Sequence, residues 1–415
     1  MKETLRTTYC IIGGGITGTT AAETIRERDP YARIALVGTE PHPLYSRVLL
    51  PRFVRGGIAR EKVLLRSIGE YETKHIDLFL NETVAAMDTE KRVLNTDAGR
   101  TIAFEKLLIA SGGRVRTWEY ERVLPKRILR FQTLDDAERI RAAIAAQRHG
   151  SAVVIGGGFI AMELVGIFAH AELQTTLLSR NAYFWERFLE EAGGELVEAL
   201  FRIKGVAFAA QAEVVGVQRV ADRALLSTAD GKQFSADLVG VGIGLERNME
   251  FLDPRITHER GVRVDAYLQT NVERVWAAGD VAEYQDPFSG RWRTVGNWTQ
   301  AFMQGRIAGV NMTGGHEQFR TVAVYSTKLF DTVFTTIGDP ERGAAREVYW
   351  RAAPESRRYE QFTLQGHKLI GAVLINAFDQ ASAASVLIEQ GTDISGAKTV
   401  LTTPGKDLGI LMRGR

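Results

Sequence analysis

The sequence predicts an α/β fold with two Rossmann-like units followed by a smaller α+β domain, and three observations support this prediction. Short apolar runs at 9–12 and 152–155 each lead into a glycine-rich loop and then into a helical pattern. Past residue 315 the pattern changes to β-rich alternation. Four strands are expected in that region: 322–327, 332–337, 359–364 and 369–375.

The first loop has the spacing GxGxxG, which is typical of a strand-to-helix turn that binds a pyrophosphate. Gly13 permits the tight turn, Gly15 lets the backbone approach the phosphates, and Gly18 allows close packing of helix on strand. The helix N-terminus then faces the anion with free N–H groups. Glu40 follows the next expected strand, 33–37, at the spacing where a carboxylate accepts a hydrogen bond from a ribose.

The second loop repeats this pattern with one change. Gly156 and Gly158 stand at the first two glycine positions, and Ala161 takes the third, which the fingerprint tolerates. Two dinucleotides are therefore implied. The duplication suggests hydride transfer between a nicotinamide and a flavin, because side chains alone do not supply that reaction.

The strand after the second loop lacks the acid that would accept a ribose hydroxyl. It ends in Ser179 and Arg180 instead. Arg180, with Arg187 further on, is suited to pair with a 2′-phosphate, because a guanidinium recognises phosphate through two parallel hydrogen bonds. The pattern favours NADPH over NADH. The alternative, that both arginines are solvated and either nucleotide is used, stays open.

Three further strands end in small residues at the sheet edge where open α/β sheets bind ligands. One apolar strand leads into Gly279 and Asp280, and that carboxylate is placed to accept hydrogen bonds from a polyol such as the ribityl chain of a flavin. Ser111 and Gly112 follow another strand, and Gly242 follows a third. We expect the last two segments to be crossings between domains.

The domain boundaries follow from these motifs. The first domain is discontinuous, because the strand that carries Asp280 must return to the sheet that begins with the first loop. Thr133, with Asp136 three residues later, predicts the cap of a helix near the start of the second domain. A closing helix is expected near 379–391. The expected domains are 1–117 with 245–317, 118–244, and 318–415.

Together, these segments resemble the two-dinucleotide flavoprotein reductases related to glutathione reductase, the pyridine nucleotide-disulfide oxidoreductase superfamily. The resemblance covers about the first 315 residues: an FAD fingerprint, an ASGG segment, an NAD(P) fingerprint and AAGD before a helix. It implies a three-layer ββα arrangement in each dinucleotide domain, with FAD at the first loop and NADH or NADPH at the second.

Two segments resemble one branch of that superfamily. The segment PLYSRVLL at 43–50 is similar to the PxYxRxxL pattern of rubredoxin reductases, of oxygenase ferredoxin reductases and of the flavin-binding part of NADH-dependent nitrite reductases. The segment that begins at Asn297 is similar to their WxxAxxQG helix. The resemblance places Arg47 and Trp298 in the FAD site, although a tryptophan at a helix start packs a core equally well. It also implies that the third domain covers one flavin face and can form a homodimer surface.

Catalytic candidates come from the same resemblance. In these reductases a lysine near the PxYxR segment pairs with a glutamate of the second fingerprint helix, beside the flavin. Aligned residue by residue, the two positions are Arg52 and Glu163 here. Arginine keeps the charge of lysine but not its shape. The alternative, that both are ordinary charges at a domain interface, stays open.

Composition excludes several classes of function. Cys10 is the only cysteine, so no redox pair, dithiol relay or iron–sulfur cluster is possible, and the seven histidines show no metal-ligand spacing. A net charge of +2 gives no support for nucleic acid or an anionic membrane as partner. No run approaches ~20 apolar residues, and the first strand begins too early for a secretory signal. We expect a cytoplasmic protein without a metal site.

The expected function is an FAD-dependent NAD(P)H reductase. With no cysteine relay, electrons leave the flavin directly, to a small carrier of the rubredoxin or ferredoxin type or to a partner subunit. Two alternatives remain: a flavin NAD(P)H oxidase or quinone reductase, and a redox-sensing binding protein of the apoptosis-inducing-factor type. The sequence does not identify the acceptor, because carrier recognition depends on surface charge that a linear chain does not display.

Overall fold

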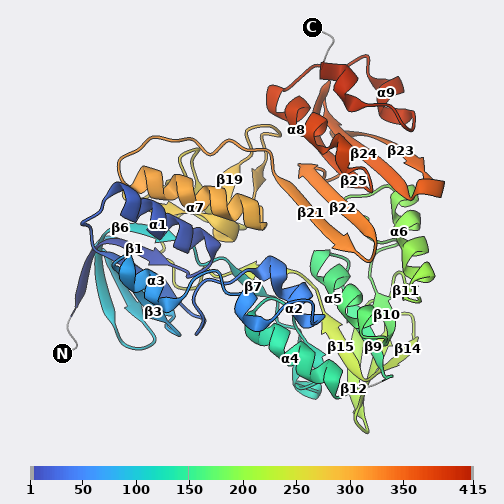
Figure 1. Cartoon of the computed structure of the whole chain (residues 1–415), viewed down its shortest axis with the longest axis horizontal. Coiled ribbons are helices and arrows are strands. Elements are labelled where there is room, and N and C mark those ends of the chain that lie inside the picture. Colours follow the sequence, from blue (N-terminus) through green and yellow to red (C-terminus); the bar gives the residue numbers. More distant parts are fainter. Residues whose placement is uncertain (1–3, 148, 413–415) are drawn as a thin grey trace. The chain divides into compact units, whose positions relative to one another are not determined.

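The computed structural model describes residues 4–147 and 149–412 (Figure 1). Contacts within the chain divide it into two units, each of which is described by itself. The first unit comprises Met1–Leu49, Ile58–Arg114 and Glu246–Thr321, and the second comprises Leu50–Gly57, Val115–Leu245 and Val322–Arg415. The predicted division into three domains stays a prediction.

The first unit is built on a seven-stranded sheet in the order β3-β2-β1-β6-β5-β4, with β18 paired to β6. β1, β2, β3, β6 and β18 run parallel, and β4 and β5 add antiparallel strands. The strands are β1 (Leu5–Ile12), β2 (Ile34–Gly38), β3 (Ile76–Leu80), β4 (Val84–Asp88), β5 (Val93–Thr96), β6 (Thr101–Ile109) and β18 (Val275–Ala277). The helices are α1 (Ile16–Arg28), α3 (Ile68–Thr73) and α7 (Trp298–Met312).

A small sheet accompanies the large one in this unit. Its strands are β17 (Val262–Val264), β19 (Ala282–Gln285) and β20 (Trp292–Arg293). Elsewhere, β7 (Gly113–Val115) and β16 (Leu245–Arg247) pair with each other. The turn η4 (Gly279–Val281) joins β18 to β19 and carries Asp280.

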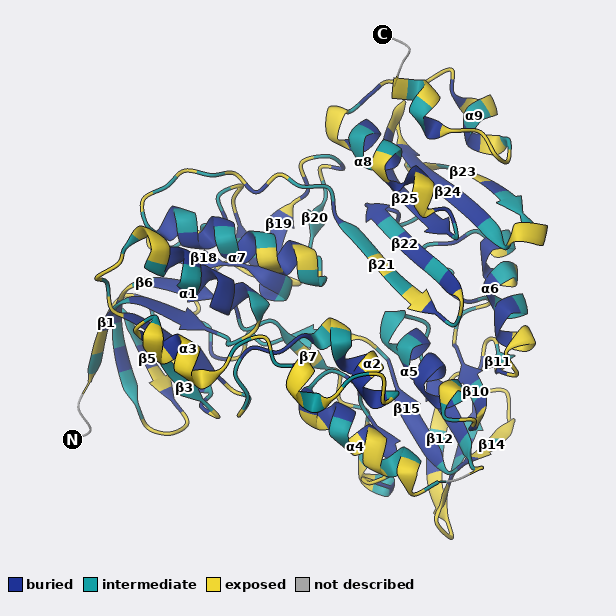
Figure 2. Ribbon diagram, in the orientation of Figure 1, coloured by how far each residue is buried: buried dark blue, intermediate teal, exposed yellow. Residues whose placement is uncertain are grey.

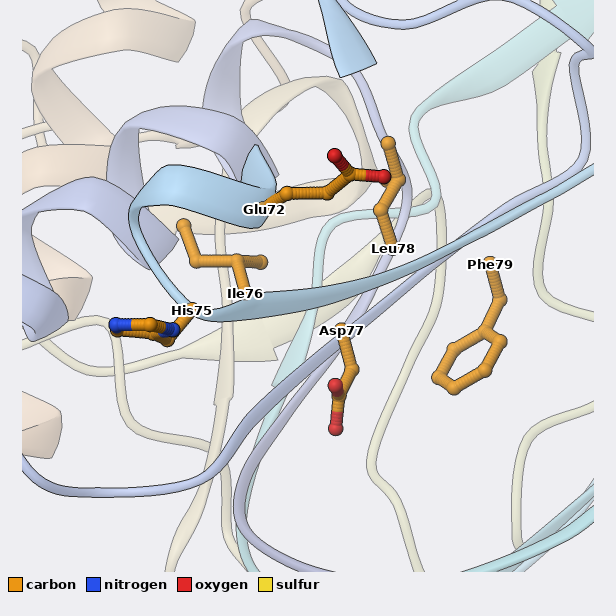
Figure 3. Close-up of a pocket in the computed structure, with 6 residues that line it drawn as sticks. All are labelled: Glu72, His75, Ile76, Asp77, Leu78 and Phe79. Carbon is orange, nitrogen blue, oxygen red and sulfur yellow. The ribbon is translucent and has the colours of Figure 1, made fainter. Parts of the chain in front are cut away.

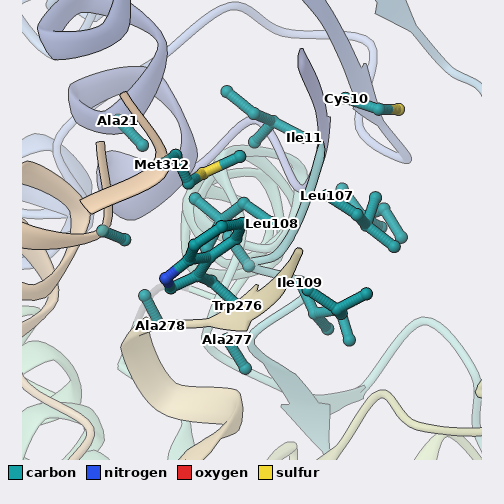
Figure 4. Close-up of a cluster of buried hydrophobic side chains, with 14 of the residues drawn as sticks. Cys10, Ile11, Ala21, Leu107, Leu108, Ile109, Trp276, Ala277, Ala278 and Met312 are labelled. Carbon is teal, nitrogen blue, oxygen red and sulfur yellow. The ribbon is translucent and has the colours of Figure 1, made fainter. Parts of the chain in front are cut away.

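The core of the first unit lies at the centre of its sheet, where Figure 2 shows the strands most deeply buried. Side chains from β1, β6 and β18 meet there with residues of α1 and α7 (Figure 4). Cys10 belongs to this cluster and is fully buried. Burial raises the pKa of its thiol to about 12, so the thiolate needed for disulfide exchange does not form at neutral pH.

The second unit contains a parallel five-stranded sheet in the order β11-β10-β9-β15-β8. Its strands are β8 (Ile128–Leu129), β9 (Ser151–Ile155), β10 (Gln174–Leu178), β11 (Ala207–Ala209) and β15 (Leu238–Val241), with an antiparallel sheet of β12 (Val214–Val220), β13 (Arg223–Thr228) and β14 (Gln233–Ala236). The helices are α2 (Leu50–Val54), α4 (Leu134–Ala145), α5 (Phe159–His170) and α6 (Glu191–Ile203).

An antiparallel sheet in the order β21-β22-β25-β24-β23 completes the second unit. Its strands are β21 (Val324–Leu329), β22 (Thr332–Gly338), β23 (Glu347–Ala353), β24 (Arg358–Gln365) and β25 (Lys368–Ile375), followed by α8 (Ala381–Gln390) and α9 (Lys398–Thr402). The predicted mixed α/β fold is confirmed. The four expected strands of this region are present, whereas β23 and α9 were not predicted.

Candidate functional site

The first glycine loop joins β1 to α1 and has one open face. An added Cβ at Gly13 (φ +114°) would lie 2.1 Å from the Ala110 carbonyl oxygen, and one at Gly18 would lie 1.9 Å from the Gly13 oxygen. Packing therefore requires glycine at both positions. Gly15 differs, because an added Cβ there has no heavy atom within 4 Å. The N-terminus of α1 thus opens onto free space where a pyrophosphate could approach.

The predicted ribose acceptor, Glu40, is already held by two side chains. One carboxylate oxygen accepts a hydrogen bond of 2.6 Å from the Tyr45 hydroxyl, and the other accepts one of 2.5 Å from Arg47. Burial opposes the charge of Arg47, but the neighbouring Tyr45 and Glu40 outweigh it and raise its pKa. The role of Tyr45 in holding Glu40 was not predicted, although Tyr45 stands in the same PxYxR segment as Arg47.

Asp280 is a carboxylate whose oxygens accept no hydrogen bond from the described residues. Its turn begins at Gly279 (φ +78°), where an added Cβ would lie 2.4 Å from Thr17 Oγ1. Within the described residues, the Asp280 carboxylate accepts no hydrogen bond, and burial raises its pKa although Arg247 and Arg47 act in the opposite direction. Both oxygens therefore keep lone pairs for hydrogen bonds from a ligand, and the predicted role of Asp280 in binding a polyol stays a prediction.

Ser111 and Gly112 follow β6, beside the first glycine loop. The Ser111 hydroxyl donates to the Asn248 backbone oxygen at 2.8 Å, and the Asn248 side-chain amide donates to the Ser111 backbone oxygen at 2.9 Å. Gly112 has φ +61°, and an added Cβ there has no heavy atom within 4 Å. The pairing with Asn248 has no signal in the sequence, because the two residues are 137 positions apart.

α7 begins at Trp298, which is half-buried. The Asn297 side chain caps this helix by accepting the Gln300 N–H at 2.9 Å. One turn further on, Gln304 accepts the Gly279 N–H at 2.7 Å. The helix that resembles the WxxAxxQG segment is thereby joined to the turn that carries Asp280.

The second loop, in the second unit, repeats the geometry of the first. An added Cβ at Gly156 (φ +134°) would lie 2.2 Å from the Gly242 oxygen, and one at Gly242 would lie 2.7 Å from the Ala161 nitrogen. At Gly158 an added Cβ has no heavy atom within 4 Å. Ala161 therefore fills the close-packed position, and the N-terminus of α5 has an open face.

The two arginines proposed for a 2′-phosphate differ in their surroundings. Arg180 is exposed and forms no ion pair within the part of the chain that the structure describes. Arg187 pairs with Glu341 at 2.9 Å and lies over the Phe188 ring. Arg180 is therefore the arginine whose charge is available for a ligand at this loop.

Glu163 lies one turn after the start of α5 and is contacted by β21. A carboxylate oxygen accepts a hydrogen bond of 2.7 Å from Thr327 Oγ1. Burial raises the pKa of Glu163, while the bond from Thr327 and the charge of Arg55 reduce the shift.

The predicted pairing of Arg52 with Glu163 is not formed among the described residues. Arg52 is exposed, and the cation that acts on Glu163 is Arg55, one turn further along the chain. Arg55 packs against α5 near Glu163: its Nη1 lies 3.6 Å from an added Cβ at Gly166, three residues after Glu163. A residue-by-residue alignment carries no information on this packing. The catalytic roles of Arg52 and Glu163 stay predictions.

A separate hollow of about 350 Å³ lies along β3 in the first unit (Figure 3). It is lined by Glu72, His75, Ile76, Asp77, Leu78 and Phe79, none of which is a predicted site residue. Among residues 4–147 and 149–412, no cluster of three or more His, Cys, Asp or Glu could hold a metal ion. No described helix has the length and apolarity needed to span a membrane.

Comparisons with known proteins agree with this geometry. The family model described as pyridine nucleotide-disulphide oxidoreductase matches residues 7–305. The nitrite reductase [NAD(P)H] of Bacillus subtilis is 27% identical over 93% of this chain, which spans 47% of that protein. The ferredoxin–NAD(+) reductase component of the biphenyl dioxygenase system of Paraburkholderia xenovorans is 28% identical over 98% of this chain and 99% of its own length.

Among solved structures, the covalent putidaredoxin reductase–putidaredoxin complex contains a similar chain. Its TM-score is 0.90 at 22% identity, and the match covers 98% of each chain. This likeness supports the fold. The glycine loops and the Asp280 turn all lie in the region that the family model matches.

Proposed function

The chain belongs to the pyridine nucleotide-disulphide oxidoreductase family, and from this premise we propose that it is an FAD-dependent NAD(P)H reductase that delivers electrons to a small carrier protein or to a partner subunit. The observation that carries the proposal is the combination, in one unit, of an open phosphate loop at Gly15 and an Asp280 carboxylate that accepts no hydrogen bond from the described residues. Such a pair suits a ligand with both a pyrophosphate and a polyol chain, as FAD has.

The residues of the first unit fit FAD on chemical grounds. The α1 N-terminus offers free N–H groups to the pyrophosphate, Glu40 keeps lone pairs for a ribose hydroxyl, and Asp280 accepts from the ribityl chain. Trp298 begins the helix whose N-terminal N–H groups favour negative charge. When bound, the flavin supplies a ring that accepts a hydride and gives up electrons.

The second loop is the proposed NAD(P)H site. Gly158 leaves the α5 N-terminus open to a pyrophosphate, and Arg180 is free to meet a 2′-phosphate. These observations support NADPH as the preferred donor. The biphenyl dioxygenase relative is named for NAD(+), so the two donors need to be compared directly.

The exit of electrons follows from the absence of a thiol relay. Cys10 is the only cysteine and is buried in the core, with its pKa raised to about 12 by that burial. Electrons therefore leave for an external acceptor. A ferredoxin- or rubredoxin-type protein is the acceptor we propose, and the ferredoxin–NAD(+) reductase of the biphenyl dioxygenase system supports that class. We further propose a homodimer in the cytoplasm, where an unpaired cysteine stays reduced.

The test is an anaerobic titration of the purified protein. We expect a yellow protein with a flavin absorbance spectrum that is bleached by one equivalent of NADPH, and more slowly by NADH. Turnover should then be at least about tenfold faster with a ferredoxin or rubredoxin than with oxygen or a quinone, which corresponds to about 1.4 kcal/mol in barrier height. A colourless protein that does not bind added FAD would overturn the proposal.

A further inference from the structure

Gln304 of α7 makes one hydrogen bond that bears on the FAD site. Its side chain is fully buried, and Oε1 accepts the Gly279 N–H at 2.7 Å. Gly279 directly precedes Asp280, the carboxylate assigned to the flavin polyol. We propose that Gln304 is a positioning residue that fixes the turn from which Asp280 binds FAD. This proposal rests on the proposed function and adds a determinant that does not itself contact the cofactor.

The turn at Gly279 is restrained by backbone conformation and packing as well as by this hydrogen bond. Its backbone has φ +78°, a left-handed conformation that favours glycine, and an added Cβ would lie 2.4 Å from Thr17 Oγ1. The three-residue turn η4 starts at Gly279, so the hydrogen bond from the Gly279 N–H to Gln304 restrains the backbone one residue before Asp280. The acceptor on Gln304 therefore holds the start of the turn from which the Asp280 side chain extends.

Contacts between α1 and α7 hold Gln304 in place. Thr17 Oγ1 donates to the Ala301 oxygen at 3.1 Å, one helical turn before Gln304. Gly305 allows this approach, because an added Cβ there would lie 2.4 Å from the Thr17 backbone oxygen. The phosphate-loop helix, the Asp280 turn and α7 thus meet at one junction, and Gln304 supplies its side-chain acceptor.

Asp280 has no second hydrogen-bonded restraint among the described residues, although the charges of Arg247 and Arg47 act on it. Its carboxylate accepts no hydrogen bond from the described residues, and Oδ2 lies 3.1 Å from an added Cβ at Gly296. A shift of the turn would therefore also shift the Asp280 carboxylate.

The side-chain nitrogen of Gln304 makes no use of its position, which indicates that the acceptor oxygen is what position 304 requires. Nε2 is buried and has no hydrogen-bond partner among the described residues. An unsatisfied buried donor is unfavourable, and a methionine of similar length would avoid it. The Gly279 N–H would then lose its acceptor instead.

The test compares FAD affinity in the full-length apoprotein, measured by the change in FAD fluorescence on binding. The key variant is Gln304→Met, which keeps the length and removes the acceptor. The matched control is Gln300→Met on the same helix, because Gln300 is also buried but its oxygen accepts from Thr321 Oγ1 rather than from the Asp280 turn. Both variants are repeated in an Asp280→Asn background.

We expect Gln304→Met to weaken FAD binding by about tenfold or more, and Gln300→Met by less than about threefold. In the Asp280→Asn background the additional loss from Gln304→Met should shrink to about twofold or less, because coupled residues are non-additive. Equal losses in both glutamine variants, or a Gln304 effect that is unchanged in the Asp280→Asn background, would overturn the proposal.

Gln304→Glu keeps an acceptor oxygen and covers the case in which Gln304→Met does not fold. At pH 6 it should bind FAD within about threefold of the parent, and a loss beyond about tenfold would count against the proposal. Failure of the proposed function gives a different result, since the parent apoprotein itself would then not bind FAD.

Discussion

The Thr327 hydroxyl donates a 2.7 Å hydrogen bond to the Glu163 carboxylate, joining β21 to α5 one turn after the helix begins. Tyr325, two residues earlier on β21, packs against Phe159 with ring centroids 4.5 Å apart. The same face of the strand thus contacts residues 159 and 163 of the helix, which are one turn apart. This contact buries Glu163 directly beyond the loop proposed to bind NAD(P)H.

The first prediction concerns the pH dependence of stability. Burial raises the pKa of Glu163 above its usual value of 4.5, so ionisation of this group penalises the folded state. Its contribution is fully favourable below pH 4.5 and is lost as the pH rises through the folded pKa. Relative to the parent, Glu163→Gln should therefore be more stable at pH 8 than at pH 4.5, as measured by urea unfolding. Glu355→Gln, at an exposed carboxylate, is the control. A difference between Glu163→Gln and the parent that did not change with pH would contradict the assignment.

The second prediction separates Arg55 from Arg52. Arg55, directly after α2, acts electrostatically on Glu163, whereas Arg52 is exposed within α2. At pH 8, Arg55→Ala should cost about 1–3 kcal/mol of unfolding free energy, because it leaves a buried charge uncompensated. Arg52→Ala should stay within about 0.5 kcal/mol of the parent, as is usual for surface sites. The Arg55 effect should decrease in a Glu163→Gln background. An equal effect in both backgrounds would show that Arg55 acts through packing alone.

Local patterns in the sequence predicted much of the backbone, because they act over a few residues. Thr133 and Asp136 form the expected capping box, with the Asp136 N–H donating to Thr133 Oγ1 at 3.1 Å. The predicted hairpin partners at 359–364 and 369–375 pair as β24 and β25. β23 was missed because its alternation is broken by Arg351, which is buried through an ion pair with Glu360.

Long-range pairings were not predictable in the same way. Asn248 on Ser111, Arg55 beside Glu163 and Thr327 on Glu163 join residues that are more than 100 positions apart. Their side chains are common surface types, so nothing in the linear pattern marks them. The glycines were predictable because close backbone approach leaves no other residue type, as at Gly13 and Gly156.

The third prediction uses the difference between Gly13, which is closely packed, and Gly15, which has an open face. Gly15 has φ −73° and an open face, so Gly15→Ala should change the unfolding free energy of the apoprotein by less than about 1 kcal/mol. The new methyl group would occupy the space proposed for the pyrophosphate and weaken FAD binding by about 100-fold or more. Gly13→Ala should instead cost about 3 kcal/mol or more, because of its left-handed φ and the contact with Ala110.

Thermal unfolding of the apoproteins and FAD titration check these two variants. The parent and Gly15→Ala should unfold within a few degrees of each other. If Gly15→Ala bound FAD as tightly as the parent, the pyrophosphate site would have to lie elsewhere in the unit.

The last prediction concerns donor choice. Arg180 has no ion-pair partner among the described residues, whereas Arg187 is engaged by Glu341 at 2.9 Å. If the 2′-phosphate binds at this end of β10, Arg180→Gln should lower kcat/KM for NADPH by about tenfold, or about 1.4 kcal/mol, and change that for NADH by less than about twofold. Arg187→Gln should have a smaller effect, because the phosphate must compete with Glu341 for that guanidinium. Steady-state kinetics with both donors measures the ratio for each variant. Equal losses with NADH and NADPH in Arg180→Gln would mean that Arg180 contacts a part common to both nucleotides, and the preference for NADPH would lose its basis.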